Sequence, residues 1–395
     1  MSYRLVLTDQ AANVWLDSCH LDSFACGISS DSYWSVRKHT CQGGLSHGVD
    51  VIHVSNGKLH FTVCPTRGMG ILNAACDQLC LAWQSPVRGP VHPAVVDLDA
   101  RRGLGWLRGF DELIVRCGLN FMGAPGRDAV RVADGSVAEM DLTLHGRIAN
   151  IPARYVAVEI SDESPPVISI TGVVTESALF AAQLQLETCI STVAGSRRVT
   201  IADRVVNRGG IDAELELLYH CNFGVPLLGE QARVRAPFRV VAPRTPGAAR
   251  AIGTFDRYAA PTPGFAEQVY FCELHGDDSG ETLAMLQNAD ASAGVALRYN
   301  TGALPFFTLW KNTAAVADGY VTGLEPGTAY PNPRMFEREQ GRVVCMPPGG
   351  AYETRLTMEP CPDSESVAQA GVEIDALQAR GEATVYSEPQ PKYAC

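Results

Sequence analysis

Two histidine-centred segments carry the residues of this chain that are best suited to chemistry. The first reads Leu-His-Gly-Arg-Ile-Ala-Asn around His145, and the second reads Tyr-His-Cys-Asn-Phe-Gly-Val-Pro around His220. Imidazole is the only side chain whose unperturbed pKa lies between about pH 5 and 8, so it suits proton transfer near neutral pH. Two such residues, beside small and amide-bearing side chains where a β-rich pattern breaks, favour acid–base catalysis. The alternative interpretation is that each histidine is buried and hydrogen-bonded in the core.

One carboxylate stands out in the same way. Glu325 is flanked by Leu324 and Pro326 after an apolar strand, a position that is poorly explained by a solvated surface charge. If it is buried, its pKa is raised and it could serve as a base. Its alternative role is to cap a turn.

Polar side chains next to aromatic residues indicate a sugar site. Aromatic faces cover the C–H side of a sugar ring, while planar donors and carboxylates pair with its hydroxyls. Segments of this composition contain Arg67, Arg108, Asn222 and Lys311, and a weaker one begins at Glu267. We expect the first four to orient sugar hydroxyls, and the positive charges of the two arginines and the lysine could also hold an acidic or phosphorylated sugar. The aromatic residues nearby could instead belong to the core.

The composition limits the class of protein and its partners. Of the 395 residues, 46% are hydrophobic and 19% are charged, which is typical of a globular chain. A net charge of -11 argues against a nucleic-acid partner, because phosphate neutralisation needs clustered Lys and Arg. There is no apolar run of about 18 residues to predict a membrane helix. The first ten residues do not resemble a signal peptide, and 13 scattered cysteines favour free thiols in a reducing cytoplasm.

Short alternating segments predict an all-β fold. The Asn56-Gly57 dipeptide predicts a hairpin between two apolar strands. Further strands are expected at 155–160, 167–171, 184–188, 198–206 and 352–358. Many short strands separated by Gly, Pro and Asn turns favour an antiparallel sandwich or barrel.

The chain divides into one large domain and a tail. No clear linker interrupts residues 1–360, which we therefore expect to form a single domain. Within the tail, 361–395, a short helix is expected from Ser364 to Arg380, followed by a loosely ordered polar end. The tail could pack on its own domain or on a second subunit, which would make the protein a homodimer.

Five motifs in matching order resemble the galactose mutarotase superfamily, in its aldose 1-epimerase-like branch. They are RGMGI at Arg67–Ile71, W-x-R-G-F-D at Trp106–Asp111, LHGRIAN at Leu144–Asn150, YHCNFGVPLL at Tyr219–Leu228 and GLEPGT at Gly323–Thr328. The resemblance implies a large antiparallel β-supersandwich. It also implies that His145 polarises the sugar near its ring oxygen, that His220 is the general acid, that Glu325 is the base and that Glu267 holds hydroxyls.

The motifs depart from the superfamily pattern close to each of these residues. Arg147 follows the Leu-His-Gly motif where characterised enzymes have a second glycine, and Cys221 begins a rearranged version of the second histidine motif. The usual Thr-Gln after the glutamate is missing. The departures leave the acid–base trio intact and affect the residues that recognise the sugar.

The leading functional hypothesis is therefore cofactor-free interconversion of the α and β anomers of a small carbohydrate. A base and an acid across a sugar ring could also remove a proton next to a carbonyl, giving epimerisation, isomerisation or elimination. A carbohydrate-binding protein without catalysis is a third hypothesis. A metal site built from two His and two Glu is a fourth, but no close ligand spacing supports it, so no metal is expected.

Overall fold

Alternating apolar side chains build the central strands. In β13 (Val167–Ser177), Ile168, Ile170 and Val174 are fully buried, and the odd-numbered residues between them are partly exposed. This two-residue period presses one face of the strand against the core. The predicted hairpin is present: the Asn56-Gly57 turn joins β5 to β6, and Gly57 has a φ of 98°, in the region that favours glycine.

The computed structural model describes residues 2–28, 30–131 and 134–395. Its strands form a ten-stranded sheet, a fourteen-stranded sheet and a separate hairpin. In spatial order the ten-stranded sheet contains β17 (Arg233–Arg235), β20 (Glu281–Gln287), β21 (Gly294–Asn300), β25 (Ala351–Cys361), β15 (Val199–Asn207), β14 (Gln183–Val193), β13, β12 (Tyr155–Ile160), β1 (Tyr3–Asp9) and β2 (Val14–Trp15).

The fourteen-stranded sheet runs from the C-terminal strand β26 to β3, near the N-terminus. In spatial order it contains β26 (Thr384–Val385), β18 (Phe238–Pro243), β19 (Gln268–Leu274), β22 (Phe306–Asn312), β23 (Val321–Gly327), β16 (Ala213–Phe223), β9 (Ile114–Leu119), β7 (Gly70–Cys76), β6 (Leu59–Cys64), β5 (Asp50–Ser55), β4 (Ser35–Thr40) and β3 (Cys19–Asp22). Two short strands extend it, β24 (Val344–Met346) beside β16 and β8 (Leu79–Cys80) beside β7.

Helices are few and mostly short. The α-helices are α1 (Ser23–Cys26), α2 (Ala100–Gly103), α3 (Pro246–Ala249), α4 (Arg334–Glu339) and α5 (Ser364–Gln378). The 3-10 turns are η1 (Gly44–Ser46), η2 (Pro93–Val95), η3 (Gly105–Arg108), η4 (Ile148–Asn150), η5 (Ile252–Thr254) and η6 (Val316–Asp318), and the separate hairpin is β10 (Gly126–Arg131) with β11 (Val137–Leu142).

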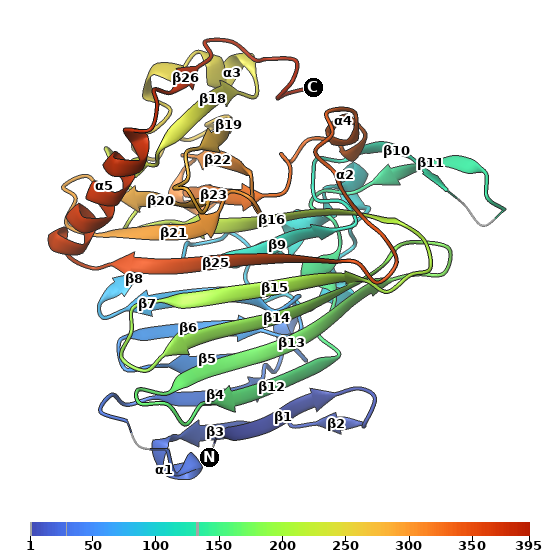
Figure 1. The fold of residues 1–395 in the computed structure, drawn as a ribbon, viewed down its shortest axis with the longest axis vertical. Helices are drawn as coiled ribbons and strands as arrows, with labels where there is room; N and C mark the ends of the chain where they lie inside the picture. The colour runs from blue at the N-terminus through green and yellow to red at the C-terminus, as the bar shows by residue number, and fades with distance from the viewer. Residues whose placement is uncertain (1, 29, 132–133) are drawn as a thin grey trace.

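The two large sheets lie face to face, with the ten-stranded sheet nearer the viewer in Figure 1. The main core fills the space between them, and it includes Val158, Ile170, Leu217 and Leu309. This architecture confirms the expected all-β supersandwich. A smaller apolar cluster around Trp106 lies on the outer face of the fourteen-stranded sheet, and the candidate site is built on it.

The C-terminal tail is more ordered than the sequence indicates. Helix α5 is present where a helix was expected, with Asp363 as its N-cap. The residues after it do not form the expected loosely ordered end, because β26 pairs with β18 in parallel and Tyr393 is 3% exposed. The Tyr393 hydroxyl donates to Glu273, and its backbone oxygen accepts from Asn332. The tail thus packs on its own domain, beside the segment that follows β23.

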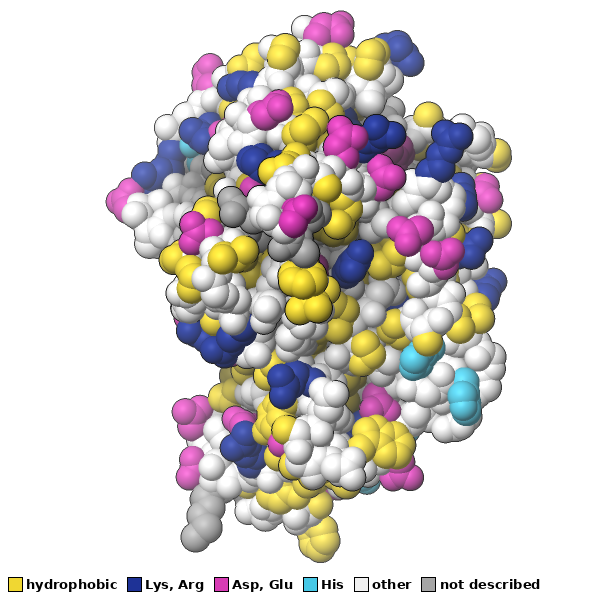
Figure 2. Space-filling view, turned by 90° about the vertical axis from the view of Figure 1, so that its right-hand side faces the viewer, with side chains coloured by type: hydrophobic (Ala, Val, Ile, Leu, Met, Phe, Trp, Pro, Cys, Tyr) yellow, Lys and Arg dark blue, Asp and Glu magenta, His cyan; other side chains and the backbone are white. Residues whose placement is uncertain are grey.

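The surface carries charges of both signs. On the face shown in Figure 2, acidic and basic side chains are interspersed with hydrophobic ones. None of the helices in the described ranges combines the length and the apolar character needed to span a bilayer.

Candidate active site

The register of two neighbouring strands brings His220 and Glu325 together. Strands β16 and β23 are antiparallel, with Cys221 opposite Leu324 and Asn222 opposite Gly323. One further step along this register puts His220 opposite Glu325, so both side chains lie on the same face of the sheet. The His220 Nε2 atom is 3.2 Å from Glu325 Oε1. The two predicted proton-transfer groups are therefore direct neighbours, although they are far apart in sequence.

His220 points to the outer face of the sheet, away from the main core. Its chain neighbours Tyr219 and Cys221 belong to the core between the sheets, and strand alternation turns His220 the other way. There the aromatic rings of Phe110 and Trp310 approach the imidazole edge-on, with centroids 5.1 and 5.3 Å away. The imidazole is therefore enclosed by apolar surface.

His145 completes the group from a turn outside the sheet. Its ring lies 5.4 Å from that of His220 and 4.6 Å from Trp106, centroid to centroid. The backbone carbonyl of Met122 lies 3.0 Å from His145 Nδ1, which fixes the orientation of the ring. His145 has a φ of 59°, a left-handed conformation that is uncommon for residues other than glycine. Such strained positions cluster at functional sites.

Burial keeps the acid–base groups neutral. It raises the pKa of Glu325 well above its ordinary value, and the charge of Glu267 adds to this effect. Burial also lowers the pKa of His220 far below its ordinary value, with a further contribution from His145. The pKa of His145 falls to about 4 for the same reason, desolvation. The 3.2 Å contact places His220 Nε2 within proton-transfer distance of the Glu325 carboxyl group. Within the described part of the chain, no group of three or more His, Cys, Asp or Glu residues could hold a metal ion.

Glu267 lies at the solvent-facing side of this group. Its Oε2 accepts from the Trp310 indole nitrogen at 2.8 Å, and its side chain remains 57% exposed. The Arg244 guanidinium is 4.0 Å from Glu267, and its charge lowers the pKa of both His145 and Glu325. Sequence reasoning missed Arg244, because only the pairing of β18 with β19 brings it beside Glu267.

Asn222 contacts His220 and has no exposed surface. Its Oδ1 lies 2.6 Å from His220 Nδ1, and its Nδ2 donates to the backbone oxygens of Glu112 and His220. The side chain is 0% exposed. The structure therefore corrects the expectation that Asn222 orients sugar hydroxyls, since its hydrogen-bonding groups are used within the protein.

Arg67 is buried beneath the site instead of lining it. Its side chain is 0% exposed, and its Nε donates to Glu112 at 2.6 Å. Its Nη1 donates to the backbone oxygen of Val91 and to Asn150. Gly109 packs against the guanidinium so closely that a Cβ there would lie 2.7 Å from Nη1. The predicted sugar contact is thus replaced by an ion pair that anchors the turn before β9.

Lys311 and Arg108 also differ from the expectation. Lys311 follows Trp310 on β22, so strand alternation turns it to the opposite face. There its Nζ donates to three backbone oxygens and lies 4.9 Å from the centre of the Tyr258 ring. Arg108 ends η3 as an exposed side chain, and in the described structure it forms no hydrogen bond or ion pair. The structure thus brings neither cation into contact with His220 or Glu325.

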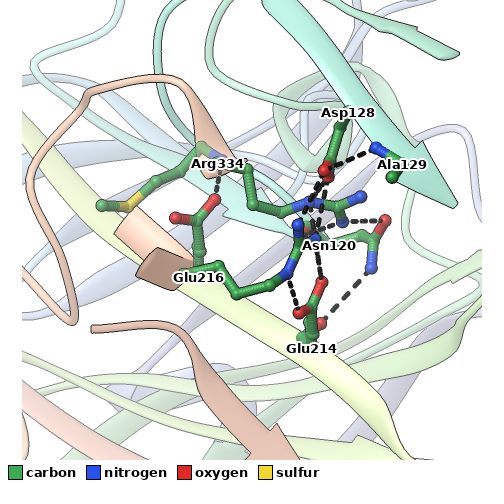
Figure 3. A network of polar contacts seen from close by, with 8 residues as sticks. Asn120, Asp128, Ala129, Glu214, Glu216 and Arg334 are labelled. Carbon is green, nitrogen blue, oxygen red and sulfur yellow. Dashed lines mark hydrogen bonds and ion pairs between the residues drawn. The ribbon is translucent and has the colours of Figure 1, made fainter. Parts of the chain in front are cut away.

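A network of acidic side chains and arginines (Figure 3) supports the turn between β9 and β10, in which the Met122 carbonyl contacts His145. Asp128 and Glu214 accept from arginines of α4, and Arg334 also donates to Asn120 at the start of this turn. Glu216 Oε2 accepts from the backbone N–H of Met122, whose carbonyl faces His145. Glu216 therefore holds the backbone of Met122, the residue whose carbonyl orients the imidazole.

Replacing Glu216 with glutamine should change how stability depends on pH. Burial raises the pKa of Glu216 from 4.5 to about 8, so the folded protein keeps it neutral where the unfolded chain ionises it. This difference lowers the free energy of unfolding by about 1.4 kcal/mol per pH unit as pH rises through that interval. The Glu216→Gln variant lacks this loss. Urea unfolding at several pH values from 5 to about 8 should therefore show the free energy of unfolding of the variant rising relative to that of the wild type as pH increases. A difference between the two proteins that does not change with pH would contradict the prediction.

Comparisons with known proteins identify the family. The family model described as "Domain of unknown function (DUF4432)" matches residues 46–359. A comparison with curated proteins finds no match. Among solved structures, a "putative aldose 1-epimerase" from Klebsiella pneumoniae shares 34% identity with a TM-score of 0.92, and the match covers 99% of both chains.

More distant structures share the fold. A galactose mutarotase-like protein from Clostridium acetobutylicum is 13% identical, with 82% of this chain and 98% of that chain covered and a TM-score of 0.54. A "putative aldose 1-epimerase" from Escherichia coli K12 is 14% identical with a TM-score of 0.53, and the match covers 80% of this chain and 99% of that chain. This chain belongs to the DUF4432 family, is related to the Klebsiella protein named as a "putative aldose 1-epimerase", and has the galactose mutarotase-like fold.

Proposed function

We propose that this protein interconverts the α and β anomers of a sugar by acid–base catalysis without a cofactor. The observation that carries the proposal is the 3.2 Å contact between His220 Nε2 and Glu325 Oε1. In a cyclic sugar the ring oxygen and the anomeric hydroxyl oxygen are bonded to the same carbon. An acid and a base that lie side by side, as His220 and Glu325 do, can therefore reach these two oxygens together.

The proposed reaction needs one transferable proton on this pair. With the proton on Nε2, Glu325 takes the proton of the anomeric hydroxyl while His220 protonates the ring oxygen. The bond between the anomeric carbon and the ring oxygen breaks, and a carbonyl forms. After the carbonyl turns over, the reverse transfers close the ring as the other anomer and restore the pair. Positioned acid–base groups of this kind contribute about 10²–10⁴-fold to a rate.

The surrounding residues supply the contacts that a sugar ring needs. Trp310 offers an aromatic face that is partly accessible, and Glu267 and Arg244 provide an acceptor and a donor for hydroxyls. His145 has its Nδ1 on the Met122 carbonyl, so its other nitrogen is free to accept a hydrogen bond from a hydroxyl. The name of the Klebsiella protein, at 34% identity, agrees with this assignment.

The test is an NMR screen of anomer exchange. Aldohexoses, pentoses, ketoses and uronic acids are each measured with and without enzyme, in light and heavy water. Faster exchange of at least one sugar, with no deuterium bound to carbon, is the expected result. Deuterium on carbon would assign the same residues to epimerisation, isomerisation or elimination. Binding without any acceleration, across the whole panel, would overturn the proposal in favour of a carbohydrate-binding protein.

A further inference from the structure

The hydrogen bonds around Asn222 determine which nitrogen of His220 carries the hydrogen. His220 and Asn222 lie two residues apart on β16, so their side chains share one face of the strand. The atoms in contact are Nδ1 of the imidazole and Oδ1 of the amide, 2.6 Å apart. A neutral imidazole has one N–H and one lone pair, and its partners decide which nitrogen has which.

The orientation of the Asn222 amide is itself fixed. Its Nδ2 donates to the backbone oxygens of Glu112 and His220, each at 3.0 Å. Both partners can only accept, so a flipped amide would place its oxygen against two carbonyl oxygens. Oδ1 therefore faces the imidazole as an acceptor, and Nδ1 must donate. Because Asn222 is fully buried, water does not offer an alternative partner.

We propose that Asn222 is a positioning residue that holds His220 as the Nδ1–H tautomer and so makes Nε2 the atom that exchanges protons with Glu325 and the sugar. The exchange part of this inference rests on the proposed function, whereas the tautomer part does not. With the hydrogen on Nε2 instead, two acceptors would meet at 2.6 Å, and Nε2 could not take a proton from Glu325.

Two substitutions separate the acceptor role of Asn222 from its size. Asn222→Asp keeps an acceptor oxygen at Nδ1. Its second oxygen faces the two carbonyl oxygens that Nδ2 contacts, so the buried side chain should be a neutral acid that donates to one of them and preserves the tautomer. Asn222→Leu has a similar volume but no acceptor, so the Nδ1–H form should no longer be favoured. Cys221→Ala is the control, because its side chain points to the main core on the other face. Loss of the partner that fixes the tautomer of a metal-bound histidine costs about 10- to 100-fold in activity, and by analogy we expect a loss of this order in kcat of Asn222→Leu with KM little changed.

The tautomer is read directly by ¹⁵N NMR of protein labelled at histidine, without any sugar, with His220 assigned from the His220→Gln spectrum. A protonated Nδ1 and an unprotonated Nε2 are expected in the wild type, Asn222→Asp and Cys221→Ala, with a mixture in Asn222→Leu. A wild-type Nε2–H signal, or an unchanged tautomer in Asn222→Leu, would overturn the inference. If Asn222→Leu does not fold, the spectra of the wild type and of Asn222→Asp still show which nitrogen of His220 carries the hydrogen. The absence of any sugar turnover would count against the proposed function alone.

Discussion

The Glu325→Gln variant is expected to lose about 10²–10⁴-fold in kcat for anomer exchange, with KM little changed. Glutamine has nearly the same shape as glutamate but cannot take up or release the proton. Glu325 is 2% exposed, so bulk water does not replace it as a base. The rate is measured by NMR exchange between anomers, with the best sugar from the screen. Wild-type exchange in this variant would show that another group is the base.

Glu267→Gln is the matched control for this prediction. Glu267 is a carboxylate of the same site, but it is 57% exposed and bonded to Trp310 instead of His220. Its replacement should raise KM more than it lowers kcat, because the proposed contacts of Glu267 with sugar hydroxyls are made in both the ground state and the transition state. Thermal unfolding of both variants checks that neither effect comes from loss of the fold.

Local patterns predicted the elements of the fold because strands are encoded by short-range alternation. The segment 155–160 is β12 to the residue, and the Asn56-Gly57 turn forms its hairpin. The tail was less predictable. Its end is polar by composition, but it is held by the burial of Tyr393 and by the pairing of β26 with β18, which depend on distant partners.

The candidate site was predictable only where residue type and the neighbouring sequence together marked a residue. The two histidines and Glu325 were recognised from their motifs, and the structure brings them together. The predictions for the cations were wrong because their partners lie far away in sequence. Arg67 pairs with Glu112 and Lys311 donates to three backbone oxygens, and no local pattern encodes these contacts. The alternation of β22 could have excluded Lys311 from the site that contains Trp310, since the two residues are neighbours and must point to opposite faces of the sheet.

The Gly323→Ala variant should lose about 10²-fold in kcat while keeping its fold. A Cβ at Gly323 would lie 2.2 Å from Glu325 Oε1 and 3.2 Å from His220 Cε1, so the acid–base pair would have to move apart. Displacing reacting groups by about 1 Å can cost 10²-fold in rate. Strand β23 itself accepts alanine, because Gly323 does not have a positive φ. The measurements are anomer-exchange rates and thermal unfolding.

Gly229→Ala is the matched glycine control, since a Cβ at Gly229 would meet nothing within 4 Å and its φ is not positive. Its kcat should equal that of the wild type. The comparison also separates two explanations of the glycine: if Gly323→Ala loses stability and kcat in parallel, the residue serves strand packing. If kcat falls at unchanged stability, position 323 needs a glycine because the Glu325 carboxyl and the His220 imidazole occupy the space that a side chain there would take. Full activity in Gly323→Ala would mean that the 3.2 Å contact between His220 and Glu325 is not needed for the reaction.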